Sequence, residues 1–260
     1  VTISDTTFRN NSADHTGGGI WASTATSFKV SRSAFVDNTT GQPNGGGIYF
    51  AGVTDFGSPV NVIENTTFSG NASLHQVGRG GALAIASGNM TIRNSTFAFN
   101  KTSPNDPPGA NAGGALWVGG GSTTAVKLQS DLFAGNTHGN ANLLVDVYRE
   151  SGGTQSTIDV ANSAFQTQPD VTTLNGTVTA AMFDTDPQID ALDESGPTPI
   201  HPLPSTSPVL DRGINPASLA TDQRGAPRAS ASTEGGQAVT DIGAYEYRTD
   251  RIFFGDFESH

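Results

Sequence analysis

The sequence predicts an all-β fold in which residues 1–168 form a right-handed parallel β-helix of about six coils. Two observations lead to this prediction. A phenylalanine returns every 27 to 36 residues through this region, and a glycine pair returns in each of the first four intervals. Stacked repeats of this length are typical of solenoids, in which each repeat packs on its neighbours. The composition agrees, because 32 glycines and only 14 % charged residues favour short strands and turns over amphipathic helices.

Each repeat is aligned on a phenylalanine that an asparagine follows three positions later. The phenylalanines are Phe8, Phe35, Phe68, Phe97, Phe133 and Phe165. The asparagines are Asn11, Asn38, Asn71, Asn100 and Asn136, and Gln168 ends the series. Coils that stack about 4.8 Å apart place equivalent residues above one another. We therefore expect a phenylalanine stack in the core and an asparagine ladder whose amides hydrogen-bond from coil to coil.

Two strands joined by a bend are expected around each phenylalanine. Five positions before it stands a branched aliphatic residue in every repeat: Ile3, Val30, Ile63, Ile92, Leu128 and Val160. Three positions before it stand mostly bend-forming residues: Asp5, Arg32, Asn65, Asn94, Ser130 and Asn162. Side chains alternate along a strand, so the bend must reset this alternation for the phenylalanine also to point inward.

A third strand is expected after the glycine pair, in residues 17–20, 45–48, 80–83 and 113–116, with a degenerate copy at 142–145. The segments between the asparagine and the glycine pair are predicted to be loops at one corner, at residues 12–16, 39–44, 72–79 and 101–112. No repeat is recognisable after residue 168. We therefore expect residues 169–260 to form a non-repetitive segment that docks on the β-helix.

The pairing of Phe-x-x-Asn with Gly-Gly-[Ala/Gly]-[Ile/Leu] resembles the repeat of the polymorphic outer-membrane protein family. Members of that family are surface-exposed β-helical proteins implicated in adhesion, so the resemblance implies a bacterial surface or secreted protein with a binding role. It covers residues 1–168 and rests on the two motifs together.

A second resemblance covers residues 186–246. Its motifs are Ser-Pro-Val-Leu-Asp at 207–211, Thr-Asp-Gln-Arg-Gly at 221–225 and Asp-Ile-Gly-Ala-Tyr-Glu at 241–246. Their order is similar to the choice-of-anchor (Q-type) C-terminal region that follows β-helix repeats in bacterial surface and secreted proteins. Arg212 departs from the small residue usual after the aspartate. The resemblance implies export, and it implies no reaction.

The bulk composition excludes several classes of partner and site. A net charge of −11 with only 13 Lys and Arg residues argues against nucleic acid. No apolar stretch approaches the length of a membrane span, and without cysteine neither a disulfide nor a thiolate site can form. We expect no cofactor. Because the chain starts partway through a coil, we also expect Val1 to be a boundary within a longer protein.

The candidate binding residues are Trp21, Tyr49 and Trp117, each directly after the inward aliphatic residue of the third strand. Alternation along the strand points all three outward, as a stripe of aromatic rings. Such rings suit stacking on a glycan or anchoring a host or neighbouring surface protein. The alternative is that the C-terminal segment folds back and covers the stripe. Asp146 is expected at the equivalent position of the degenerate copy.

Catalysis is the rival class of function, because many parallel β-helices are polysaccharide lyases or glycoside hydrolases. A lyase needs an Arg or Lys base beside Ca²⁺-binding carboxylates, and no stacked acid cluster is evident beside the arginines of the coils: Arg9, Arg32, Arg79, Arg93 and Arg149. Charged residues do gather in the C-terminal segment, where docking explains them without a substrate: Asp211, Asp222, Arg224, Arg228, Asp241 and Glu246.

Three histidines, His15, His75 and His138, fall in the variable corner, and we expect solvated side chains there rather than a metal site. The sequence thus favours a non-catalytic, exported adhesion or binding module.

Overall fold

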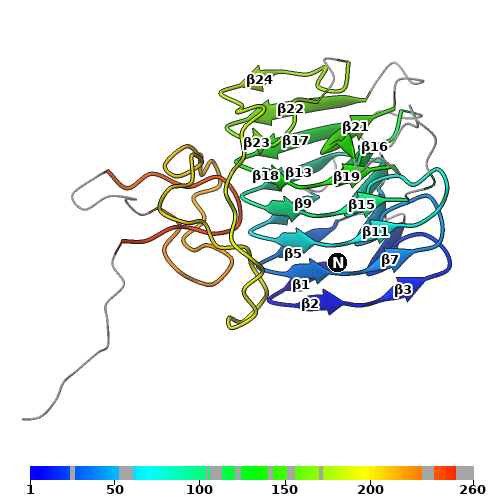
Figure 1. Ribbon diagram of the computed structural model, residues 1–260, viewed down its shortest axis with the longest axis horizontal. Helices are drawn as coiled ribbons and strands as arrows, with labels where there is room; N and C mark the ends of the chain where they lie inside the picture. Colours follow the sequence, from blue (N-terminus) through cyan, green and yellow to red (C-terminus); the bar gives the residue numbers. More distant parts are fainter. Residues whose placement is uncertain are drawn as a thin grey trace, which may run out of the picture.

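The computed structural model describes residues 1–23, 27–52, 61–103, 105, 113–120, 124–139, 143–150, 156–169, 172–229 and 237–249. In these ranges every regular element is a strand, and the strands form four sheets, here named A to D. Figure 1 shows the strands stacked as successive coils, with the C-terminal segment beside them. Among the described residues no helix is long and apolar enough to cross a membrane.

Each complete coil contributes one short strand to each sheet. Sheet A contains β1 (Thr2–Ser4), β5 (Lys29–Ser31), β9 (Val62–Glu64), β13 (Met90–Arg93), β17 (Ala125–Gln129), β22 (Thr157–Ala161) and β24 (Val178–Thr179). Sheet B contains β2 (Thr7–Arg9), β6 (Ala34–Val36), β10 (Thr67–Ser69), β14 (Thr96–Ala98), β18 (Leu132–Ala134) and β23 (Ala164–Phe165). Sheet C contains β3 (Ser12–Ala13), β7 (Thr39–Thr40), β11 (Ala72–Ser73), β15 (Lys101–Thr102), β19 (Thr137–His138) and β20 (Leu143–Leu144). Sheet D contains β4 (Ile20–Ser23), β8 (Ile48–Ala51), β12 (Leu83–Ser87), β16 (Leu116–Val118) and β21 (Val147–Arg149).

The pairing is parallel in all four sheets except between β19 and β20, which are antiparallel. Five coils pass through all four sheets, and the fifth enters sheet D as β21. A sixth coil supplies only β22 and β23, and β24 adds one further strand to sheet A. The predicted all-β parallel solenoid is therefore confirmed.

The bend before each phenylalanine is a single residue in the left-handed region. Its φ is 51° at Asp5, 43° at Arg32 and 48° at Asn65, and the later coils repeat it. One left-handed residue turns the chain from sheet A into sheet B and resets the side-chain alternation, as the sequence predicts.

A second left-handed corner follows the phenylalanine, and the sequence analysis missed it. Asn10, Asp37 and Phe99 have φ of 54°, 53° and 57°, and Gly70 and Gly135 occupy the same place in other coils. The chain then enters the two-residue strands of sheet C. The predicted corner loops thus begin as strands, so each complete coil has four strands rather than three. Strands of two residues are too short to show an alternating pattern in a sequence.

The six repeat phenylalanines lie in register in the core. Successive ring centroids are 4.7 to 4.9 Å apart, with interplanar angles of 9° or less. Phe183 continues the stack on Phe165 at 5.5 Å. The core therefore extends beyond residue 168, because the chain crosses back after β23 to form β24.

The repeat asparagines form a continuous ladder beside this stack. The Nδ2 of Asn38 donates to Asn71 Oδ1 at 2.9 Å and also to the Phe8 carbonyl at 3.0 Å, and the later asparagines repeat this pattern. Asn136 ends the series by donating to Asp146 Oδ1 at 2.9 Å. Amides that would be costly to bury alone are thereby satisfied in every coil.

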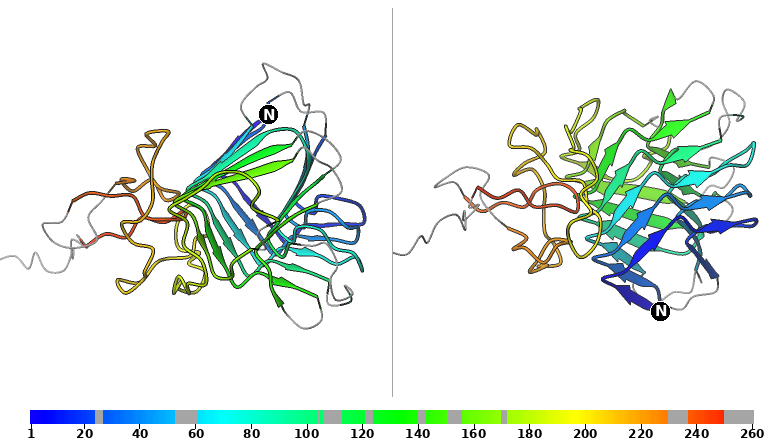
Figure 2. Two further views of the ribbon diagram at one scale, coloured as in Figure 1. Left: turned by 90° about the horizontal axis from the view of Figure 1, so that it is seen from above. Right: turned by 60° about the horizontal axis from the view of Figure 1, so that its bottom comes forward.

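The C-terminal segment docks at the corner between sheets A and B. Leu203, Val209 and Ile242 pack on Leu132 and Ala164 in a second apolar cluster. Figure 2 shows this segment, in yellow to red, lying against one corner of the coils.

Polar contacts reinforce the docking. Ser69 Oγ lies 2.9 Å from His201 Nε2, and the opposite ring nitrogen lies 2.9 Å from the Asp190 carbonyl oxygen. Because a carbonyl only accepts, Nδ1 carries the proton and Nε2 accepts from Ser69. Burial lowers the pKa of His201, against the Asp190 contact, which acts to raise it. The neutral ring thus joins the docked segment to sheet B.

Candidate functional site

The predicted aromatic residues lie in one row on the outer face of sheet D. Trp21 pairs in register with Tyr49, Tyr49 with Ala84, Ala84 with Trp117, and Trp117 with Tyr148. Their neighbours Ile48, Leu83 and Leu116 point into the core, so alternation turns the row outward.

The row is not uniformly accessible. The Trp21 residue is 65 % exposed and Tyr49 is half-buried, but only 4 % of Trp117 is exposed. The guanidinium of Arg79 covers the Trp117 ring, with its Cζ 4.7 Å from the ring centroid. The expectation that Trp117 is an exposed part of the stripe is therefore wrong, because the side chain from the loop of the coil below lies over it.

The fifth position of the row is Tyr148, and the expectation of Asp146 is wrong. Asp146 instead aligns with Ala115, because the N–H groups of Ala115 and Leu116 both donate to its carbonyl, at 3.1 and 3.0 Å. The sequence misled because the glycine pair that marks this strand in the other coils is missing here. Val147 and Tyr148 nevertheless keep the inward and outward pattern.

Most described contacts of the C-terminal segment lie on sheets A and B and on the corner between them. At the upper end of sheet D, Arg149 of β21 donates to the Thr172 carbonyl at 2.6 Å. Figure 1 shows this segment on the left, whereas the labels of β16 and β21 in sheet D stand on the right. The docked part of residues 172–249 that the structure describes thus leaves Trp21 and Tyr49 uncovered.

The arginines considered as bases are mostly held in ion pairs. Arg9, Arg32 and Arg93 lie 2.6, 2.7 and 2.6 Å from Glu194, Asp5 and Glu64 respectively. Arg79 lies 3.4 Å from Glu150. Each arginine faces one carboxylate, an arrangement that supplies neither a cation-binding cluster nor an unpaired base.

The carboxylate of Glu64 forms ion pairs with two cations. Its carboxylate lies between Lys29, at 2.8 Å, and Arg93, at 2.6 Å. Burial acts to raise the pKa of Glu64, but the hydrogen bonds from Lys29 and Arg93 hold it below its ordinary value. Glu64 is thus a charged structural residue on the outer face of sheet A.

The three corner histidines do not converge. His138 is buried with its Nδ1 3.0 Å from Thr102 Oγ1, His75 accepts from the backbone N–H of Val77, and His15 is exposed. Within the described ranges no three His, Cys, Asp or Glu side chains could hold a metal ion.

The charged residues of the C-terminal segment form ion pairs with one another and one contact with the solenoid. Arg224 pairs with Asp222 at 2.6 Å, and the fully buried Arg228 lies 3.5 Å from Glu246. Arg228 also hydrogen-bonds Asn65 of the solenoid. The two ion pairs lie within the C-terminal segment, and the bond from Arg228 to Asn65 joins the segment to the corner of sheets A and B.

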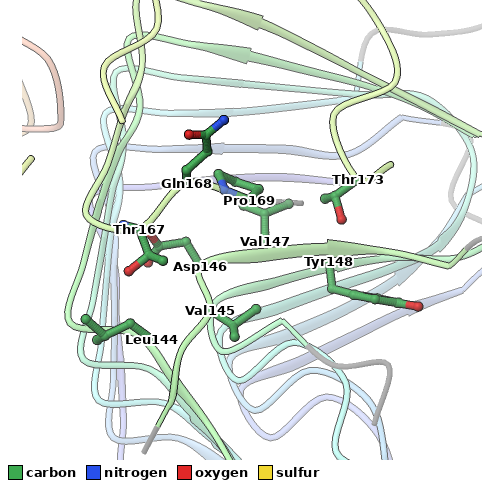
Figure 3. Close-up of a pocket in the computed structure, with 9 residues that line it drawn as sticks. All are labelled: Leu144, Val145, Asp146, Val147, Tyr148, Thr167, Gln168, Pro169 and Thr173. Atoms are coloured by element: carbon green, nitrogen blue, oxygen red, sulfur yellow. Dashed lines mark hydrogen bonds between the residues drawn. The ribbon is translucent and has the colours of Figure 1, made fainter. Parts of the chain in front are cut away.

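A pocket of about 160 Å³ lies at the upper end of the solenoid, and the sequence analysis missed it (Figure 3). Its lining residues are Leu144, Val145, Asp146, Val147, Tyr148, Thr167, Gln168, Pro169 and Thr173. Burial raises the pKa of Asp146 to about 6, against hydrogen bonds from Asn136, Thr167 and Gln166 that act to lower it. The available signal was an aspartate at the position where other coils have Gly or Ala.

A family model described as the right-handed β-helix region matches residues 1–165. Neither the curated proteins nor the solved structures include a match to the chain. The match spans the four stacked sheets with their phenylalanine and asparagine ladders. On this evidence the chain belongs to the right-handed β-helix family.

Proposed function

We propose that the protein is a non-catalytic module of a bacterial surface or secreted protein that binds a glycan through the outer face of sheet D. The observation that carries this proposal is the exposed Trp21, 65 % accessible and in register with the half-buried Tyr49. The surface location rests on the resemblance to outer-membrane β-helix repeats and choice-of-anchor regions. Accessibility of the protein to antibody on intact cells would test it.

The chemistry of the face favours a neutral sugar chain. Two aromatic rings one strand apart offer apolar surface for the C–H faces of successive sugar rings. A net charge of −11 opposes the approach of an acidic polysaccharide. We therefore expect neutral glycans to bind more tightly than uronate-containing ones.

Tryptophan fluorescence tests the proposal directly, because the chain has only two tryptophans and they differ sharply in exposure. Titration with neutral polysaccharides is expected to give a saturable change in emission and to protect Trp21 from acrylamide. Trp21→Ala should abolish binding, whereas Trp117→Phe should retain both binding and the emission change.

Product formation decides between this function and the enzymatic alternative. The same samples are followed for reducing ends and for the absorbance of unsaturated products, with and without Ca²⁺. Binding without product supports the module. Product released by the wild-type protein, or glycan binding unchanged in Trp21→Ala, would overturn the proposal.

A further inference from the structure

The guanidinium of Arg79, on the outer face of sheet D, has hydrogen-bond donors to spare. Among the described residues its single hydrogen bond runs from Nη2 to Glu150 Oε1, at 3.4 Å, which is longer than an ordinary charged hydrogen bond. Arg93 differs, because its Nε and Nη2 both donate to Glu64, at 3.0 and 2.6 Å. The Arg79 side chain is also 36 % exposed, so its remaining donors can reach a ligand.

The carboxylate of Glu150 likewise has acceptor capacity to spare. Its Oε1 faces Arg79, and its Oε2 accepts from the backbone N–H of Gly120 at 3.4 Å. A carboxylate offers about four lone-pair positions, so these two long contacts leave several of them for other donors. The side chain is 29 % exposed. A donor group and an acceptor group therefore stand 3.4 Å apart, and both are open to solvent.

Trp117 holds the guanidinium in place from below. The Cζ of Arg79 lies 4.7 Å from the centroid of the Trp117 ring. The ring extends over Gly119, where a side chain would begin 3.1 Å from Cη2, so glycine leaves the room that the ring occupies. The Nε1 of Trp117 is buried and has no partner among the described residues, so it does not face a ligand. Trp117 is thus a positioning residue for Arg79.

This polar pair shares the outer face of sheet D with the two accessible aromatic rings. Trp117 stands two strands above Tyr49 in the outward row, or about 10 Å at the usual strand spacing. Between them the row has only Ala84, whose side chain is a single carbon. A sugar chain that stacks on Trp21 and Tyr49 and continues along the row therefore reaches Arg79 and Glu150.

We propose that Arg79 and Glu150 are specificity-determining residues of this face, and that together they bind two neighbouring hydroxyl groups of one uncharged sugar residue. The inference rests on the proposed glycan-binding function. Arg79 donates to the oxygen of one hydroxyl, and Glu150 accepts a hydrogen bond from the other.

The opposite charges of the pair explain why the sugar must be neutral. A uronate placed there would meet the negative charge of Glu150, and an amino sugar would meet the positive charge of Arg79. Hydroxyl groups both donate and accept, so they satisfy the two side chains at once. Trp21 and Tyr49 then supply affinity through the apolar ring face, whereas Arg79 and Glu150 distinguish sugars by the arrangement of their hydroxyls.

Three β-1,4-linked hexasaccharides test the proposal, because they share a pyranose chain and differ in their hydroxyls: cellohexaose, mannohexaose and xylohexaose. Titration calorimetry should give wild-type Kd values that differ at least tenfold between the tightest and the weakest. Arg79→Lys keeps the charge but loses the planar fork, and Glu150→Gln loses the charged acceptor. Each should narrow the spread to within threefold. Arg9→Lys is the matched control, because it alters an exposed pair with Glu194 away from sheet D.

Two substitutions of Trp117 test its positioning role. Trp117→Leu removes the ring that supports the guanidinium and should narrow the spread as Arg79→Lys does. Trp117→Phe keeps an aromatic support and should retain the wild-type spread. Both leave Trp21 as the sole tryptophan, so its emission confirms that the hexasaccharide still binds at the aromatic face.

The outcomes separate this inference from the function on which it rests. Equal spreads in the wild type, Arg79→Lys and Glu150→Gln, with binding still abolished by Trp21→Ala, would overturn the specificity role alone. Binding that persists in Trp21→Ala, or wild-type protein that binds none of the hexasaccharides, would overturn the proposed function and this inference with it.

Discussion

Asparagine occupies two rows along the solenoid, and the rows stabilise different parts of the molecule. The interior row, which runs from Asn11 to Asn136, points inward and hydrogen-bonds from coil to coil. The corner row lies at the bend between sheets A and B and points outward. There Asn65, Asn94 and Asn162 donate to carbonyl groups of the C-terminal segment, at 2.7, 3.2 and 3.0 Å.

The difference shows that backbone position decides what the same amide does. Corner asparagines adopt the left-handed conformation, with φ near 48°, and this directs the amide to the surface. Interior asparagines contact the equivalent asparagine of the coils above and below, so the repeat itself supplies their hydrogen-bond partners. Corner asparagines depend on a segment that has no repeat, and the two regions should therefore respond differently to substitution.

Arg228→Ala should have the largest effect, because it breaks the contact between the corner row and the docked segment. Arg228 is fully buried and bonds Asn65, the Gly243 carbonyl at 3.0 Å and Glu246 at 3.5 Å. Its loss leaves the buried Glu246 carboxylate without this cation, and breaking a buried ion pair costs about 3–5 kcal/mol. Hydrogen exchange should accelerate in residues 209–246 and stay slow in the interior ladder. Arg212→Ala, an exposed arginine of the same segment, is the control.

Asn71→Ala tests the interior row. The Asn71 side chain accepts from Asn38 and donates to Asn100 and to the Phe35 carbonyl, all in a fully buried site. Several buried groups lose their partners, which should lower the free energy of unfolding by about 3 kcal/mol. Asn11→Ala, at the exposed end of the row, should cost no more than about 1 kcal/mol. Equal losses of denaturant stability in the two variants would contradict the ladder as a cooperative stabilising element.

The two rows were not equally predictable from the sequence. The interior row follows from a fixed spacing to Phe35 and its equivalents, because stacking in register is the only way to bury every coil. The corner row was recognised as a set of bends, but its role was not, since its partners lie in a segment with no periodicity. Contacts of that kind, such as Asn65 with the Thr221 carbonyl, depend on a tertiary arrangement that spacing does not encode.

The features of the candidate site also differ in how far the sequence could predict them. The outward direction of Trp21 and Tyr49 follows from alternation within one strand. The burial of Trp117 could not be predicted, because it depends on Arg79, a loop residue of another coil. The pocket beside Val147 was also missed, because it exists only where the repeat stops and sheet D ends before sheets A and B.

A rise in pH from acid to neutral is expected to lower the stability of the interior ladder and of the docked segment together. Burial raises the pKa of Asp146, which ends the interior ladder, and of Asp241, in the docked segment, each from 3.8 to about 6. Because each pKa is higher in the folded state than in the unfolded state, the stability that these groups contribute is fully present below the unfolded-state pKa. This stability is lost as the pH rises through the folded-state pKa of about 6. Each aspartate should therefore cost about 2 kcal/mol of unfolding free energy between pH 4.5 and 7.

Urea unfolding at several pH values measures this loss. Asp146→Asn and Asp241→Asn should each reduce the slope of stability against pH over this window, whatever their effect at a single pH. A slope that is unchanged in both variants would show that other groups cause the pH dependence.

Arg32→Asn should have the smallest effect, and it addresses the corner row itself. Arg32 holds the left-handed bend at φ 43°, where the later coils have Asn65 and Asn94. Asparagine tolerates this conformation better than arginine. The substitution also removes the ion pair with Asp5, but the two side chains are 39 % and 52 % exposed, and solvent-exposed pairs contribute at most about 1 kcal/mol. The two changes oppose each other, so the free energy of unfolding should change by less than about 0.5 kcal/mol. A loss above about 2 kcal/mol would mean that Arg32 anchors the corner as Arg228 does, and that the row is not interchangeable from coil to coil.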